Sequence, residues 1–197
     1  MKKVSIYLSV LLLFLFVGQS SVYAGWYKAK AAYERGHYEA AFKELKPLAE
    51  QGDAVAQNNL GFMYAKGEGV PKDVAEAIRW FKKAAEQGDE VAQHNLGLIY
   101  VEGEGVPKDY TEAIKWFKKA AKQGDAVAQE QLGAIYVLDR GIPSDYLMAY
   151  MWLNLAASQG KETASELINR LEEVMLPEQI AEAQRLSREF KVTKTKP

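Results

Sequence analysis

The chain has 197 residues, 48% of them hydrophobic, with 25 basic and 26 acidic side chains and no cysteine. This balance is typical of one globular domain or a short repeat array, and the near-neutral charge argues against a nucleic-acid partner, which requires a basic face. A chain without cysteine has no disulfide framework, iron–sulfur cluster or thiol nucleophile.

The first 24 residues have the pattern of a secretory signal peptide. Lys2 and Lys3 precede an uncharged, mostly apolar run at 4–17, and Ala24 ends a stretch of small and polar residues, as signal peptidase requires. A membrane anchor is the alternative, but a helix of that run spans about 21 Å, less than the roughly 30 Å of a hydrocarbon core. We therefore expect an exported bacterial protein, periplasmic or secreted, whose mature chain is not inserted in a membrane.

Most of the remaining chain repeats itself at steps of 36 residues. Self-similarity at one period indicates an array of like structural units. The matching positions are Gly52, Gly88, Gly124 and Gly160; Ala56, Ala92, Ala128 and Ala164; Leu60, Leu96 and Leu132; Gly61, Gly97 and Gly133; Tyr64, Tyr100 and Tyr136; and Trp80, Trp116 and Trp152.

Each period contains the signals of two helices. In the first period, Asp53 is placed to cap one helix, and Gly67 follows as its terminator. Asp73 with Glu76 three residues later is typical of the start of a second helix, which Gly88 ends. The sequence therefore predicts an all-α fold, a right-handed α-solenoid of antiparallel helix pairs. Its predicted parts are an N-terminal half-repeat or cap at 25–52, repeats at 53–88, 89–124 and 125–160, C-terminal capping helices at 161–190 and a disordered tail at 191–197.

The repeated strings closely resemble those of a known family. They read Ala-Glu-Gln-Gly-Asp, Val-Ala-Gln-x-Asn-Leu-Gly-x-x-Tyr, Gly-Glu-Gly-Val-Pro-Lys-Asp and Glu-Ala-Ile-x-Trp-Phe-Lys-Lys-Ala-Ala. This pattern resembles the Sel-one-like repeat (SLR) family, which is related to the tetratricopeptide repeat, over residues 53–160. The resemblance implies an adaptor that assembles or regulates protein complexes, often at the bacterial envelope.

The third repeat loses the charged outer face of the first. Where the first repeat has Glu76, Arg79 and Lys83, the third has an apolar patch. Either a last helix beginning at about Leu176 folds back over this patch, or the patch is exposed to a partner or a second copy. The patch residues are Met148, Met151 and Leu155, and the covering residues would be Ile180, Ala183, Leu186 and Phe190.

No constellation of residues predicts catalysis, a cofactor or a metal. Glu90 and His94 are four apart, but two ligands from one turn fall short of a closed zinc site, and position 94 is interpreted as a variable slot facing solvent. The glycine-rich loops lack both the phosphate-loop and the calcium-loop spacing. A basic band on the second helices is interpreted as a solvated face; its members are Arg79, Lys82, Lys83, Lys115, Lys118 and Lys119.

The positions that change between repeats are spaced by four within each first helix, so each trio lies on one face. In stacked helix pairs this face lines a concave groove, and its mixed polar and apolar groups suit an extended peptide or a partner helix. Ordinary surface variation is the alternative. The candidate groove residues are Asn58, Phe62, Lys66, His94, Leu98, Glu102, Glu130, Ala134 and Leu138.

These observations favour a non-catalytic protein–protein interaction scaffold of the bacterial envelope that binds a protein or peptide and needs no cofactor. A periplasmic regulator of a membrane sensor kinase is one alternative. A β-lactam hydrolase is another, because some secreted relatives are associated with that activity. Those relatives are cysteine-rich, whereas this chain has no cysteine.

Overall fold

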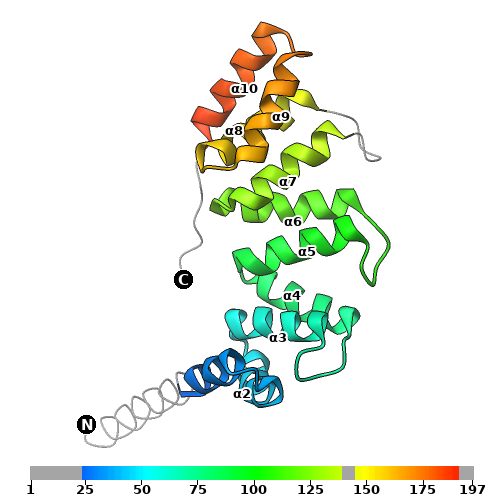
Figure 1. Ribbon diagram of the computed structural model, residues 1–197, viewed down its shortest axis with the longest axis vertical. Helices are drawn as coiled ribbons and strands as arrows, with labels where there is room; N and C mark the ends of the chain where they lie inside the picture. Colours follow the sequence, from blue (N-terminus) through cyan, green and yellow to red (C-terminus); the bar gives the residue numbers. More distant parts are fainter. Residues whose placement is uncertain (1–23, 139–144, 191–197) are drawn as a thin grey trace, which may run out of the picture. The chain divides into compact units, whose positions relative to one another are not determined.

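The computed structural model describes residues 24–138 and 145–190, and all regular secondary structure in these ranges is helical (Figure 1). The predicted signal peptide up to residue 23 and the predicted tail at 191–197 lie outside the described residues. The helices are residues 24–34, α2 (Tyr38–Glu50), α3 (Ala54–Lys66), α4 (Val74–Glu86), α5 (Glu90–Glu102), α6 (Tyr110–Gln123), α7 (Ala126–Val137), α8 (Tyr146–Ser158), α9 (Glu162–Glu172) and α10 (Pro177–Glu189).

The all-α repeat fold is therefore confirmed. Helices α3, α5 and α7 are the first helices of the three predicted repeats, and α4, α6 and α8 are the second helices. The chain forms two compact units that divide between Ala84 and Ala85. Since each unit is a body of its own, the right-handed superhelix stays a prediction.

Aspartate side chains begin both kinds of helix, as the sequence predicts. The carboxylate of Asp53 accepts a hydrogen bond of 2.7 Å from the Ala56 N–H at the start of α3. Asp109 accepts one of 2.9 Å from the Glu112 N–H at the start of α6. Each bond satisfies one of the backbone donors that a helix start leaves without an internal partner.

Close helix approach within a repeat depends on one glycine of each first helix. A Cβ atom at Gly97 would lie 2.4 Å from the Cε1 atom of Phe117, and one at Gly133 would lie 2.4 Å from the Cγ atom of Leu153. Both partners are fully buried on the second helix. The first and second helices of a repeat can therefore pack this closely only because the first helix has a glycine at this position.

The recurring tryptophans belong to the core. Trp80, Trp116 and Trp152 are 7%, 7% and 3% exposed, so they are packing residues. They are not available for stacking on a ligand.

The last helix packs on the third repeat. The ring of Phe190, at the end of α10, meets Trp152 of α8 edge-on with centroids 5.2 Å apart. Met151 is 5% exposed, and Met148 and Leu155 are half-buried in the cluster that also contains Leu186. Of the two arrangements that the sequence left open, the apolar patch is therefore the covered one. Most of it is not available to a partner.

Candidate interaction surface

Exposed apolar side chains gather on the first helices. Val55 and Phe62 of α3 are 50% and 38% exposed, Val91 of α5 is 56% exposed, and Leu138, which follows α7, is 50% exposed. Among the described residues, no large hydrophobic side chain of α4 or α6 is exposed to this degree. The two kinds of helix therefore present different chemistry to the outside.

The second helices α4 and α6 present lysines, one of which on each helix lies over the tryptophan of the same helix. Lys83 Nζ is 4.0 Å from the centroid of Trp80, and Lys119 Nζ is 4.1 Å from that of Trp116. Such cation–π contacts are worth about 0.5–1 kcal/mol at exposed sites. Arg79 pairs with Glu76 at 2.9 Å in the same band. These contacts of the basic band are therefore local, each within a single helix.

The predicted groove residues divide into two groups. Phe62, Lys66, Glu102 and Leu138 are exposed, and the other five are half-buried. Because Asn58, Phe62 and Lys66 belong to one unit and the other six to the second, the continuous groove stays a prediction. Within the first unit, Lys66 Nζ lies 5.7 Å from the centroid of the Phe62 ring.

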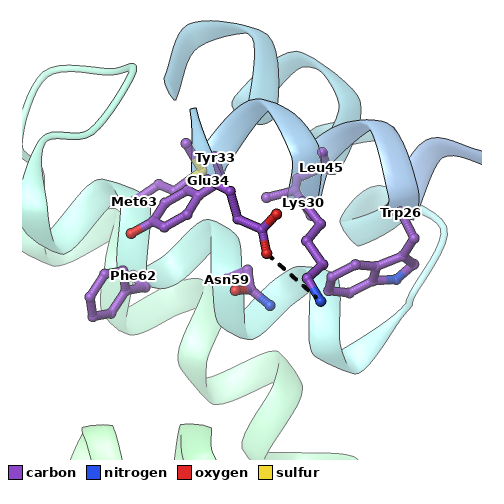
Figure 2. A pocket seen from close by; sticks show the side chains of 9 residues that line it. Trp26, Lys30, Tyr33, Glu34, Leu45, Asn59, Phe62 and Met63 are labelled. Carbon is purple, nitrogen blue, oxygen red and sulfur yellow. Dashed lines mark ion pairs between the residues drawn. The ribbon is translucent and has the colours of Figure 1, made fainter. Parts of the chain in front are cut away.

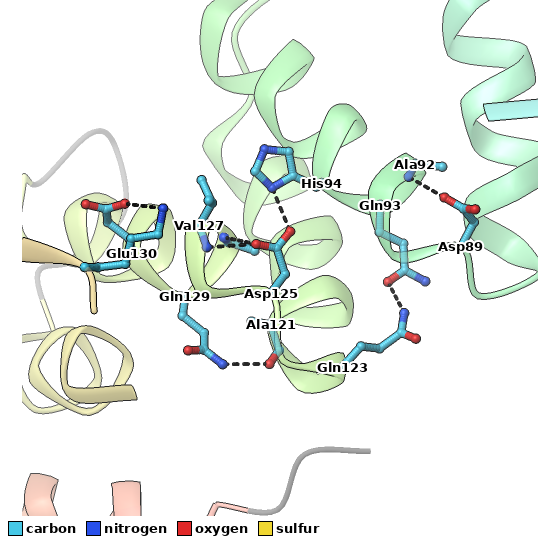
Figure 3. A network of polar contacts seen from close by, with 12 residues as sticks. Asp89, Ala92, Gln93, His94, Ala121, Gln123, Asp125, Val127, Gln129 and Glu130 are labelled. Atoms are coloured by element: carbon cyan, nitrogen blue, oxygen red, sulfur yellow. Dashed lines mark hydrogen bonds and ion pairs between the residues drawn. The ribbon is translucent and has the colours of Figure 1, made fainter. Parts of the chain in front are cut away.

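Position 94 does not face solvent, so that expectation is wrong. His94 is 16% exposed, and its Nδ1 atom lies 2.9 Å from Oδ2 of Asp125, which caps α7 (Figure 3). Glu130, one repeat later, pairs with Lys161 at 3.8 Å and accepts a hydrogen bond from Thr163 at the start of α9. These two candidate groove residues therefore join one first helix to the next.

A ladder of glutamines, which the sequence reasoning missed, links neighbouring repeats. The buried Gln93 donates a 3.0 Å hydrogen bond from Nε2 to the Ala85 carbonyl and accepts one of 2.9 Å from Gln123 (Figure 3). Gln129 likewise donates a 3.1 Å hydrogen bond to the Ala121 carbonyl and accepts one of 2.8 Å from Gln159. Glutamines recur every 36 residues at both ladder positions. That period was the signal that could have revealed them.

The first unit contains an open hollow between the helix at 24–34 and α3 (Figure 2). Its volume is about 300 Å³. Aromatic side chains stand at its ends, Leu45 and Met63 form apolar walls, and Lys30 and Glu34 lie along one rim. It includes Phe62, one of the predicted groove residues.

Tyr33 of this hollow is held rigidly. Its hydroxyl donates a 2.6 Å hydrogen bond to Oε2 of Glu68, in the loop after α3, and its ring meets Tyr38 edge-on with centroids 5.2 Å apart. Burial, reinforced by the hydrogen bond and the charge of Glu68, raises the pKa of Tyr33 to about 12. The phenol therefore stays neutral and acts as a fixed wall rather than as an acid or base.

The described residues contain no cluster of three His, Cys, Asp or Glu side chains arranged to hold a metal ion. None of the described helices combines the length and apolar character that crossing a bilayer requires.

Repeated helix pairs that begin at the same capping residues define the class of helical-repeat proteins. The Sel1 repeat family profile matches residues 54–89, 91–125 and 126–161, which together make up more than half of the chain. The chain belongs to the Sel1 repeat family, whose members typically mediate protein–protein interactions and are generally non-catalytic scaffolds.

Two solved structures of this family are similar to the chain. A Sel1 repeat protein from Oxalobacter formigenes is 38% identical over 74% of this chain and 60% of its own, with a TM-score of 0.69. The protein c5321, a protective antigen of uropathogenic Escherichia coli with an SLR fold, is 34% identical over 82% of this chain and 37% of its own, with a TM-score of 0.69. The chain thus spans 60% and 37% of the lengths of these proteins. A comparison with curated proteins gave no significant match.

Proposed function

We propose that the chain is a non-catalytic scaffold of the bacterial envelope that binds a peptide or a helix of a partner protein on its first helices. The observation that carries this proposal is the distribution of exposed apolar groups. Phe62, Val91 and Leu138 lie on or directly after first helices, whereas α4 and α6, the second helices of the first two repeats, present paired lysines and arginine. Exposed apolar groups with polar neighbours are typical of interaction sites.

The polar side chains support a scaffold rather than an enzyme. Gln93, Gln129 and Ser187 are the most enclosed polar side chains among the described residues of the second unit, and each is bonded to a neighbouring helix. A catalytic base must instead reach a substrate. The envelope location rests on the N-terminal sequence pattern, which predicts cleavage after Ala24.

Photocrosslinking in living cells tests the interaction. A photoreactive amino acid at position 62 or 98, on first helices, is expected to capture an envelope protein. The same group at position 115, on the outer face of α6, is the control and is expected to capture none. Equal capture at position 115, or capture only of cytoplasmic proteins, would contradict the proposal. Mass spectrometry of the chain purified from the envelope fraction should find Gly25 as its first residue.

A further inference from the structure

The hollow of the first unit has the features of an anchor site for a single side chain. Trp26 and Phe62 stand at its two ends, and Leu45 and Met63 supply apolar wall between them (Figure 2). Its volume of about 300 Å³ is at the lower end of the range for ligand sites. That space accommodates one bulky side chain.

The wall of the hollow is organised before anything binds. Tyr33 is fixed by its 2.6 Å hydrogen bond to Glu68, and Leu45 is 4% exposed in the core beneath. A rigid site loses little conformational entropy on binding, which favours affinity. The aromatic ends also provide large contact area, the property that interaction hot spots share.

The rim carries one charge of each sign in a fixed order. Lys30 Nζ and Glu34 Oε1 are 3.8 Å apart, and their side chains are 68% and 64% exposed. An exposed pair one helical turn apart contributes little to stability, so both groups can bond to a partner at little cost. Lys30 lies toward Trp26 and Glu34 toward Tyr33 (Figure 2).

We infer that the hollow binds an extended segment of a partner protein that inserts one bulky apolar side chain and carries opposite charges on either side of it. An acidic residue of the segment pairs with Lys30 at the Trp26 end, and a basic residue pairs with Glu34 at the Tyr33 end. This inference rests on the proposed interaction function and names the chemistry of the partner. Because the two ends differ, the charges also fix the direction of the bound segment.

The test uses the full chain and a random peptide display library. Selection is expected to enrich peptides with an aromatic or large aliphatic residue and one acidic and one basic residue within two positions of it. One enriched peptide is then measured against variants. The double variant K30E/E34K retains an intrahelical pair and changes it to the more favourable order, with the glutamate first, so the helix remains stable. It should weaken binding by at least about tenfold, because two attractive contacts become repulsive.

A peptide with its two charges exchanged should recover most of that affinity for the double variant. Trp26→Ala should also weaken binding, whereas Tyr27→Ala, which removes a 74% exposed ring outside the hollow, should not. Far-ultraviolet circular dichroism checks that each variant is folded. Enrichment of peptides without this charge pattern, or equal binding by the double variant, overturns the inference.

The proposed function is tested independently of the anchor site. Crosslinking from position 98, in the second unit, reports on that function without involving the hollow. Partner capture there, together with peptides that ignore Lys30, Glu34 and Trp26, would leave the interaction role in place and remove only the anchor site. The absence of any enriched peptide also overturns the anchor site.

Discussion

Asp125 joins two consecutive first helices through one carboxylate. Its Oδ1 atom accepts hydrogen bonds of 2.8 and 3.0 Å from the Val127 and Ala128 N–H groups, while its Oδ2 atom lies 2.9 Å from Nδ1 of His94. An ionised carboxylate only accepts, so Nδ1 of His94 is the donor. Burial raises the pKa of Asp125, but the bonds from His94, Ala128 and Val127 outweigh it and hold this pKa below its ordinary value.

Asp125→Asn is expected to destabilise the chain in a pH-dependent way. Asparagine still caps a helix, so the substitution removes mainly the charge, and we expect the free energy of unfolding at pH 7 to fall by about 1–2 kcal/mol. Because the folded-state pKa of Asp125 is depressed, its stabilisation is present above the unfolded value of about 4 and is lost as the pH falls through the folded value. Urea unfolding from pH 7 to pH 3 should show wild type and variant converging.

The partner of the carboxylate is tested by a double-mutant cycle. His94→Ala and Asp125→Asn combined should cost less than the sum of the two single changes, since both remove one bond. Strict additivity, or a difference between wild type and Asp125→Asn that does not change with pH, would contradict the proposed link.

Gln129→Ala is expected to cost about 1–3 kcal/mol of unfolding free energy, because it leaves the Ala121 carbonyl and the Gln159 amide without their bonds. Gln129 is 1% exposed, so water does not replace them. Gln131→Ala, two residues along the same helix and half-buried, is the matched control and should cost much less. Urea unfolding of the two variants measures both losses of unfolding free energy. Equal losses would show that the glutamine ladder contributes no stability.

The elements that the sequence predicts well are those whose start and end depend on residues nearby in the chain. Asp53 caps α3 because an aspartate three residues before a helical N–H accepts from it in any context. The 36-residue period identified the repeats for a similar reason. Each unit carries its own start and stop signals, so no knowledge of long-range contacts was needed.

The contacts between repeats were harder to predict. His94 was interpreted as solvent-facing because its position varies, yet it bonds Asp125, 31 residues later. A variable position is thus compatible with a specific contact, since Glu130 at the same place bonds Lys161 with the charges reversed. The hollow was also not predicted, although Trp26 and Phe62 are 36 residues apart, because its lining residues come together only in the folded unit.

Gly97→Ala is expected to destabilise the second unit by about 1–3 kcal/mol through overpacking. Its new Cβ atom would lie 2.4 Å from Cε1 of Phe117, whose side chain is fully buried. The higher helix propensity of alanine, worth about 1 kcal/mol, offsets part of this cost. Thermal unfolding followed by circular dichroism measures the net change.

The shape of the partner side chain provides the control for Gly97. Gly97→Ala should cost less unfolding free energy in a Phe117→Leu background than in wild type, since a smaller, flexible side chain can give way. A stabilising effect of Gly97→Ala alone would contradict the close approach.

Leu186→Asp is expected to uncover the apolar patch on α8. Leu186 is half-buried in the cluster with Met151 and Trp152, so a carboxylate there opposes the docking of α10. The exposed patch should promote self-association, which analytical ultracentrifugation detects, and should increase binding of a hydrophobic dye. Arg188→Asp, at an exposed site of the same helix, is the matched control. Unchanged sedimentation of the Leu186 variant would contradict the covering role of α10.

Glu112→Met should remove the hydrogen-bond partner of the Trp116 indole N–H and so make the second repeat resemble the third in this respect. Glu112 accepts a 3.1 Å bond from Nε1 of Trp116, whereas Met148 occupies the equivalent position in the third repeat and the buried Nε1 of Trp152 has no partner within the described residues. Leaving a buried donor unpaired costs about 1–3 kcal/mol, and we expect a loss of that size in unfolding free energy.

Glu112 also accepts a 2.8 Å bond from Lys115, whose side chain is 64% exposed. Lys115→Ala removes this contact, and an exposed pair of this kind contributes little to stability. The two substitutions therefore separate the two roles of one carboxylate. A cost of Lys115→Ala equal to that of Glu112→Met in urea unfolding would assign the stabilisation to the surface pair, and the tryptophan bond would then contribute nothing measurable.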